Sequence, residues 1–226
     1  MNWQDQGFVL SKIKFRENAN IINVFTNMKG KVSGIVHGGN SRKIKNFLQI
    51  SNKIFIIYSS KSENRLGNFK TELITAISPK YFNDKKRTSA LLSLSSILNL
   101  ILPDSQPYKN LYIALDELLN NFDLETWIIN YIYWELTLLK ELGFDPYLDQ
   151  FFLKNDQTHK YKSVKIDNIK YQVPIFLLTN KKVDNLENKQ ILTALSFTRE
   201  ILANKFFFPN NLTMPKSRIV LENYFN

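Results

Sequence analysis

The chain has 226 residues, 44% of them hydrophobic, with 30 Lys and Arg against 20 Asp and Glu, a formal net charge of +10. This length has room for one large or two small domains with a sizeable core. The chain contains no cysteine, which excludes disulfides and cysteine-ligated zinc and makes an intracellular protein the simplest expectation.

No segment is expected to enter a membrane. The first five residues, Met1–Asp5, are not followed by an apolar signal core. The longest uncharged run, Thr88–Pro103, has 16 residues with serines among them, so it is too short and too polar to span a bilayer. We therefore expect a cytoplasmic protein.

The positive charge is concentrated in the first third of the chain. Residues 1–80 hold 13 Lys and Arg against 4 acids, whereas residues 81–226 hold 17 against 16. A positive field on a small domain attracts polyanions such as nucleic acid, or less often an acidic membrane surface.

Five β-type runs fill the first 80 residues, and glycines mark the bends between them. The runs are Phe8–Phe15, Ile22–Met28, Lys31–His37, Lys53–Ser59 and Phe69–Ser78. Five short strands with a basic face predict a small Greek-key barrel of the oligonucleotide-binding (OB) type, and an SH3-like barrel fits nearly as well.

Beyond Pro79 the apolar residues recur at helical spacing. The expected helices are Leu91–Ile101, Tyr112–Leu119, Trp127–Leu142, Leu186–Lys205 and a short one from Pro215 to Tyr224. The fold class is therefore α+β, with an OB-fold domain over residues 1–80 and a helical-bundle domain over residues 81–226. Residues 145–180 are expected to form an irregular insertion in the helical domain. Lys160–Ile166 and Lys170–Val173 could instead pair as a small β-ribbon, and periodicity does not decide between the two.

Three helix ends carry recognisable signals. Asp123 is the expected N-cap of the helix that begins near Trp127, and Gly143 is its expected end. An Asp184…Glu187 pair is expected to cap the helix that follows. The aromatic stripe that begins at Trp127 is expected to be core, and Glu135 beside it a residue of the bundle edge or the partner of a basic side chain.

The residues suited to catalysis do not converge. His37 and His159 are 122 positions apart, and the acids of the basic domain are scattered. The stretch Gly38–Lys43 lacks the order of a phosphate-binding loop. We therefore predict no enzyme, no metal and no cofactor.

Residues suited to binding nucleic acid are more plentiful. The stretch Lys29–Lys45 combines a strand, tight turns and a basic cluster, which is typical of a backbone-phosphate grip and equally of a solvated hairpin end. Phe15, Phe47 and Tyr58 offer either base-stacking faces or barrel core. The predicted phosphate contacts are Lys12, Lys14, Arg16, Lys29, Lys31, Arg42, Lys43, Lys45 and Arg65.

Two motifs resemble a known family. The first is Trp3-x-Asp5-x-Gly7-x-Val9-Leu10, followed by Glu17, Val24-Phe25-Thr26, Gly30-Lys31, Gly34-x-Val36-x-Gly38-Gly39-x-Ser41-Arg42, Leu48-Gln49, Leu66-Gly67, Glu72 and Leu102-Pro103. The second is Trp134-Glu135-x-x-Leu138-Leu139-x-x-Leu142-Gly143-Phe144, with Pro215-x-Ser217-Arg218 beyond it. Together they resemble the bacterial recombination mediator family RecO.

The resemblance implies an OB barrel followed by a helical domain. It also implies a protein without covalent chemistry that binds single- and double-stranded DNA, anneals strands, and works with RecR to help RecA replace single-stranded-DNA-binding protein. Recognition of the acidic C-terminal tail of that binding protein is implied as well, and so is an association with the nucleoid. By the same resemblance, Arg42 matches the basic residue of the family's Gly-Gly-x-Ser-Arg segment, and Arg16-Glu17 matches the position near the end of its first strand.

One departure concerns zinc, because many members of the family carry a four-cysteine zinc module after the Leu-Gly-Phe segment. Residues Phe151–Lys170 contain no cysteine. Two other functions remain open on the sequence alone: an RNA-binding OB protein without a role in recombination, and a scaffold that binds only proteins through its helical half.

Overall fold

The computed structural model describes residues 1–38, 41–62, 65–151, 159–179 and 186–226. The chain divides into two compact units. One comprises Met1–Tyr112 with Pro215–Leu221, and the other comprises Ile113–Met214 with Glu222–Asn226. The helix after the barrel, and part of the last one, therefore belong to the same unit as the strands.

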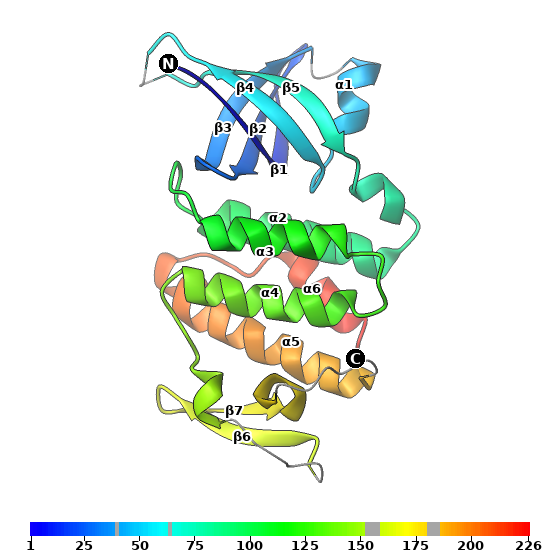
Figure 1. Cartoon of the computed structure of the whole chain (residues 1–226), viewed down its shortest axis with the longest axis vertical. Coiled ribbons are helices and arrows are strands. Elements are labelled where there is room, and N and C mark those ends of the chain that lie inside the picture. The colour runs from blue at the N-terminus through cyan, green and yellow to red at the C-terminus, as the bar shows by residue number, and fades with distance from the viewer. Residues whose placement is uncertain (39–40, 63–64, 152–158, 180–185) are drawn as a thin grey trace. The chain divides into compact units, whose positions relative to one another are not determined.

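The first unit contains a closed five-stranded barrel (Figure 1). Its strands are β1 (Asn2–Arg16), β2 (Ala19–Thr26), β3 (Gly30–His37), β4 (Lys53–Ser59) and β5 (Asn68–Thr75). They pair in the order β1-β2-β3-β5-β4, and β1 pairs with both β2 and β4 to close the barrel. A short helix, α1 (Arg42–Phe47), joins β3 to β4. This arrangement confirms the expected OB fold.

Most of the barrel core comes from alternate residues of the strands, as the period of two requires, and Leu48 at the end of α1 completes it. Its members are Val9, Ile22, Val24, Val32, Val36, Leu48, Ile54, Ile56 and Phe69. The register of β1 against β2 shifts between Val9 and Ser11, and beyond this shift Ile13 and Phe15 are 62% and 44% exposed. The last part of β1 therefore leaves apolar side chains on the surface.

Helix α2 (Lys85–Ile101) follows the barrel and begins at Asp84. The Asp84 carboxylate accepts a hydrogen bond from the backbone N–H of Arg87 and pairs with the Arg87 guanidinium at 2.7 Å. Burial alone raises the pKa of this carboxyl, but the bonds and charge of Arg87 outweigh it, so the pKa is lowered. The Asp84 cap thus belongs to the ionised form.

The remaining helices are α3 (Lys109–Asn120), α4 (Trp127–Glu141), α5 (Asn188–Leu202) and α6 (Lys216–Asn223). The expected N-cap of α4 was wrong. Thr126, not Asp123, precedes α4, and it makes no side-chain cap bond. A capping box of Glu187 and Gln190 begins α5. Glu187 belongs to the expected capping pair, and its expected partner, Asp184, lies outside the described residues.

The end of α4 is as expected. Gly143 has a φ of +92°, a left-handed conformation that favours glycine. Its N–H donates to the Lys140 carbonyl, and the Phe144 N–H donates to the Leu139 carbonyl. These two bonds form the Schellman motif that satisfies the last carbonyls of a helix.

The region between α4 and α5 holds a β-hairpin made of β6 (Tyr161–Ile166) and β7 (Ile169–Pro174). Its two-residue turn places Asp167 and Asn168 at φ of +47° and +67°, as a tight hairpin turn requires. The expectation of an irregular insertion was therefore wrong for these residues, and the ribbon left open by periodicity is present. None of the helices in the described residues is long and apolar enough to cross a bilayer.

Candidate nucleic-acid interface

Three connections of the barrel meet at one end, which we call the loop end. The Gly38 N–H donates to the Asn18 carbonyl at 2.8 Å, which joins the exit of β3 to the β1–β2 turn. Asn68, the first residue of β5, bonds the imidazole of His37 at 2.8 Å. The loop end therefore comprises residues 14–18, residues 37–38 and residues 65–68, with α1 starting close by in the chain.

Several of the predicted phosphate contacts gather at the loop end. Lys14 and Arg16 have exposed side chains on the last residues of β1, and Arg65 is exposed in the β4–β5 connection. The Arg16 guanidinium lies 5.1 Å from the centre of the Phe15 ring. Lys12 lies further along β1 and is partly buried. Arg42, Lys43 and Lys45 all belong to α1.

Two predicted contacts lie elsewhere. Lys29 is exposed in the β2–β3 turn, at the far end of the ladder from His37. Lys31 has only 12% of its side chain exposed, and its ammonium lies 3.2 Å from the Asp104 carboxylate. It also donates to the Asn99 carbonyl at 3.0 Å. Lys31 therefore contributes to the packing of α2 on the barrel, and its charge is compensated within the unit.

Helix α2 partly covers the outer face of β2 and β3. Asn23 and Ser33 are opposite each other on the two strands, and the Ser33 hydroxyl donates to the Asn23 side chain at 2.8 Å. Asn23 in turn donates to the Asn99 side chain of α2 at 2.7 Å. OB folds commonly bind oligonucleotides on this face and on the adjoining loops. Here the loops remain more accessible than the middle of the face.

The candidate stacking residues differ in their surroundings. Phe15 is 44% exposed, so its ring is accessible at the loop end. Phe47 packs against the barrel core and is therefore structural. Tyr58 also borders the core but stacks on Trp3, with ring centres 4.8 Å apart. Sequence reasoning missed Trp3 as a site residue, because β1 begins six residues earlier than its apolar alternation indicates.

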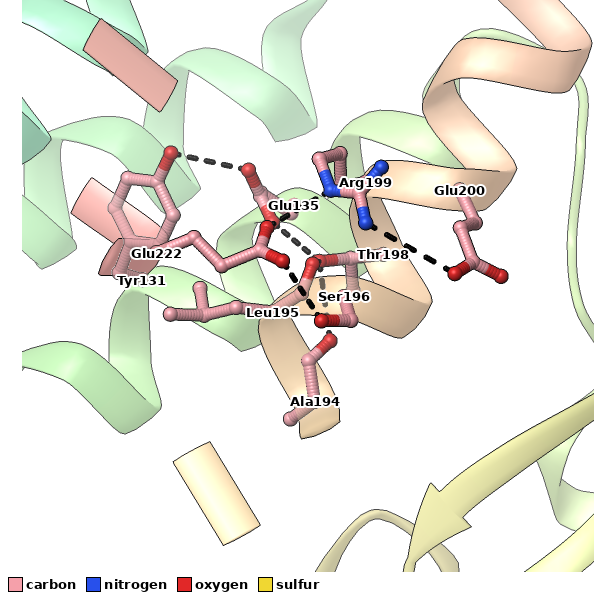
Figure 2. Close-up of polar contacts among 9 residues, drawn as sticks. All are labelled: Tyr131, Glu135, Ala194, Leu195, Ser196, Thr198, Arg199, Glu200 and Glu222. Carbon is pink, nitrogen blue, oxygen red and sulfur yellow. Dashed lines mark hydrogen bonds and ion pairs between the residues drawn. The ribbon is translucent and has the colours of Figure 1, made fainter. Parts of the chain in front are cut away.

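The second unit contains a buried polar cluster around Glu135 (Figure 2). The Glu135 side chain is fully buried, contrary to the expected place at the bundle edge. The Tyr131 hydroxyl donates to its Oε1 at 3.0 Å, and the Thr198 hydroxyl donates to its Oε2 at 2.5 Å. Nearby, Glu222 accepts bonds from Ser196 at 2.7 Å and from Arg199 at 2.9 Å. These contacts join α4, α5 and the end of α6 within this unit.

The residues present do not fit the zinc module of the resembling family. The sequence has no cysteine, and the described residues contain no cluster of three His, Asp or Glu side chains able to hold a metal ion. The β6–β7 hairpin occupies this part of the chain and is held by backbone pairing over six residue pairs.

The barrel, its basic loop end and the helices that follow define an OB-fold protein with a helical C-terminal region. Residues 1–77 match the family model of the recombination protein O N-terminal domain, and residues 83–206 match that of its C-terminal domain. The chain therefore belongs to the RecO family.

Individual relatives agree with this assignment. A "DNA repair protein RecO" of Ehrlichia chaffeensis is 29% identical over 98% of this chain and 95% of the relative. Relatives with the same name from Ruegeria sp. and Wolbachia pipientis wMel are both 34% identical over 64% of this chain, and the matches span 60% of their own lengths. A solved asparaginyl-tRNA synthetase of Entamoeba histolytica aligns with a TM-score of only 0.32 at 10% identity over 95% of this chain and 60% of that chain.

Proposed function

We propose that this chain is a DNA-repair recombination mediator that binds DNA without sequence preference at the loop end and anneals complementary strands. Support comes from membership of the RecO family, whose relatives are named DNA repair proteins. The observation that carries the proposal is that Lys14 and Arg16 at the end of β1 and Arg65 in the β4–β5 connection are exposed at the same end of an OB barrel.

The mechanism is electrostatic and needs no covalent step or cofactor. Cations on the loop end neutralise backbone phosphates and release counterions whatever the base sequence. Two strands held on one positive surface repel each other less, so pairing nucleates more readily. By the same proposal, the protein binds RecR and the acidic tail of single-stranded-DNA-binding protein, and in this way it indirectly helps RecA to load on single-stranded DNA. It is proposed to act in the cytoplasm, in association with the nucleoid.

Salt dependence tests the phosphate contacts. For about four to six neutralised phosphates of a single strand, log affinity should fall with log salt at a slope of roughly −3 to −4. Changing Lys14, Arg16 and Arg65 together to Ala should make the slope shallower by about 2, since each contact contributes about 0.7. Little change in melting temperature is expected, because exposed charges contribute little to stability.

A matched control distinguishes phosphate binding at the loop end from a general effect of the protein's net positive charge. Changing Lys80, Lys85 and Lys109 to Ala removes the same charge from exposed positions outside the loop end of the same unit. The slope should then stay close to that of the unmodified protein. Equal effects of the two triple variants would contradict a binding site at the loop end.

Function in recombination needs a separate assay. We expect the protein to accelerate annealing of complementary single strands coated with their binding protein, and to do so better with RecR present. A strong preference for RNA over single-stranded DNA of matched sequence would favour the RNA-binding alternative. Failure to bind either nucleic acid at low salt would favour a protein scaffold.

A further inference from the structure

A groove of about 380 Å³ opens on the barrel unit beside the β4–β5 connection. Its walls include Trp3 of β1, Ser33 of β3, Tyr58 of β4, Arg65 and Asp104. We propose that this groove binds one unpaired nucleobase of a single strand, stacked against the Trp3–Tyr58 pair. The inference rests on the proposed DNA binding and adds to it a subsite that distinguishes a nucleotide with a base from an abasic one.

The aromatic wall is rigid before any ligand arrives. Trp3 and Tyr58 are directly opposite on β1 and β4, and their rings stack at 4.8 Å with 18° between their planes. The edge of Phe69 packs against both rings, at 6.2 Å and 5.6 Å between centres. Since Trp3 and Tyr58 both remain partly exposed, a base can add to an ordered stack at little cost in side-chain entropy.

Two glycines make room for this wall. A Cβ atom on Gly67 would lie 2.4 Å from the Tyr58 ring, and one on Gly34 would lie 2.5 Å from the Phe69 ring. Such distances are closer than side chains can approach. The backbone at Gly67 and Gly34 therefore packs closely against the Tyr58 and Phe69 rings and restricts their movement.

The polar groups of the groove suit a nucleotide better than a bare phosphate. Arg65 supplies an exposed guanidinium for the phosphate. The Asp104 carboxylate is 72% exposed and would repel a phosphate, but it accepts hydrogen bonds from the amino or ring N–H groups of a base. The Ser33 hydroxyl uses its proton on Asn23, so its oxygen is also left as an acceptor. The base end and the phosphate end of the groove therefore differ in charge.

The covered face of β2 and β3 explains why a base would use this groove. Asn99 of α2 bonds Asn23 at 2.7 Å and also accepts from Lys31, so bases cannot lie flat across the middle of that face. The groove lies next to this contact and reaches the β4–β5 connection, which is one of the loops that OB folds use for binding. A strand that follows the loop end through Arg65 reaches the aromatic wall directly.

The test compares two strands with identical phosphates. One is an oligothymidine of about 15 nucleotides, long enough for one OB fold, and the other has the same backbone with tetrahydrofuran abasic sites. We expect the unmodified protein to bind the base-bearing strand about 5- to 150-fold more tightly, as one stacked base allows. Trp3→Leu should lose this ratio while its affinity for the abasic strand stays unchanged.

A second measurement guards against a folding defect in Trp3→Leu. Trp127 and Trp134 are 6% and 2% exposed, so quenching of tryptophan fluorescence by the base-bearing strand should come from Trp3. Trp3→Phe keeps an aromatic ring for stacking and should therefore bind the strand normally, but without quenching. Melting curves of both variants confirm that they are folded.

The outcomes separate this inference from the proposed function. Equal affinity for the two strands, with no quenching of Trp3, would overturn the base subsite and leave phosphate binding at the loop end intact. Binding of neither strand at low salt would overturn both. A preference for bases that survives in folded Trp3→Leu would place the stacked base elsewhere, and so would also overturn the inference.

Discussion

The hydrogen bond between Thr198 and Glu135 offers a test of how the helical unit is stabilised. Thr198 on α5 and Glu135 on α4 are both fully buried, and the hydroxyl lies 2.5 Å from Oε2 of the carboxyl group (Figure 2). The change Thr198→Val keeps the branched shape and removes the donor. The buried carboxyl group of Glu135 then loses one hydrogen bond.

The expected cost is about 1 to 3 kcal/mol, the range for removing one partner of a buried hydrogen bond. In a chain of this size each kcal/mol lowers the melting temperature by about 2 to 4 °C, so a fall of roughly 2 to 12 °C is expected. Urea unfolding followed by circular dichroism gives the free energy directly. Tyr131→Phe removes the other hydroxyl donor, at 3.0 Å from Oε1, and should cost a similar amount.

Thr193→Val is the matched control, because it makes the same change on the same helix. The Thr193 hydroxyl donates to the Lys189 carbonyl one turn earlier, at a half-buried position. Its loss should change stability by no more than about 0.5 kcal/mol. If Thr193→Val and Thr198→Val cost the same, the bond to Glu135 has no special role in joining the two helices.

Three further changes have defined outcomes. Gly67→Ala should cost about 1 to 3 kcal/mol by overpacking, since its Cβ would meet the Tyr58 ring, and near-ultraviolet circular dichroism should show the disturbed aromatic stack. Gly143→Ala has open space around its Cβ but a φ of +92°, so the cost of about 1 kcal/mol is conformational and no aromatic signal should change. For Asp84, whose pKa is below its ordinary value of 3.8, the stabilising charge is present above that pH and is lost as the pH falls through the lowered pKa. The difference in stability between the unmodified protein and Asp84→Asn should therefore shrink as the pH falls below about 4, and a difference that grows in acid would contradict the ionised cap.

Local patterns predicted most of the architecture. The strand Lys53–Ser59 was predicted with its observed bounds, because apolar residues alternate there between clear turn signals. The end of α4 at Gly143 was also predictable, since a left-handed residue after a helix favours glycine. The N-cap of α4 was mistaken because several polar residues precede that helix, and only the backbone path decides where the helix begins.

The candidate site was less predictable than the fold. Charge alone does not distinguish Lys31, which is held by Asp104, from Arg65, which is exposed. Trp3 and Tyr58 are distant in the chain, and their stacking depends on the register between β1 and β4. A register shift of one residue would turn either ring to the opposite face of the sheet.

A strand-rich, cationic first region, helices beyond it and the motifs of the RecO family can all be read from the order of the amino acids, because periodicity, composition and short motifs are properties of neighbouring residues. Only the folded chain shows which cations stay exposed, where the three connections of the barrel meet, and that an aromatic wall borders a groove. Those features depend on pairing between segments far apart in the chain, and the free energy of such pairing is set by packing and register rather than by local preference.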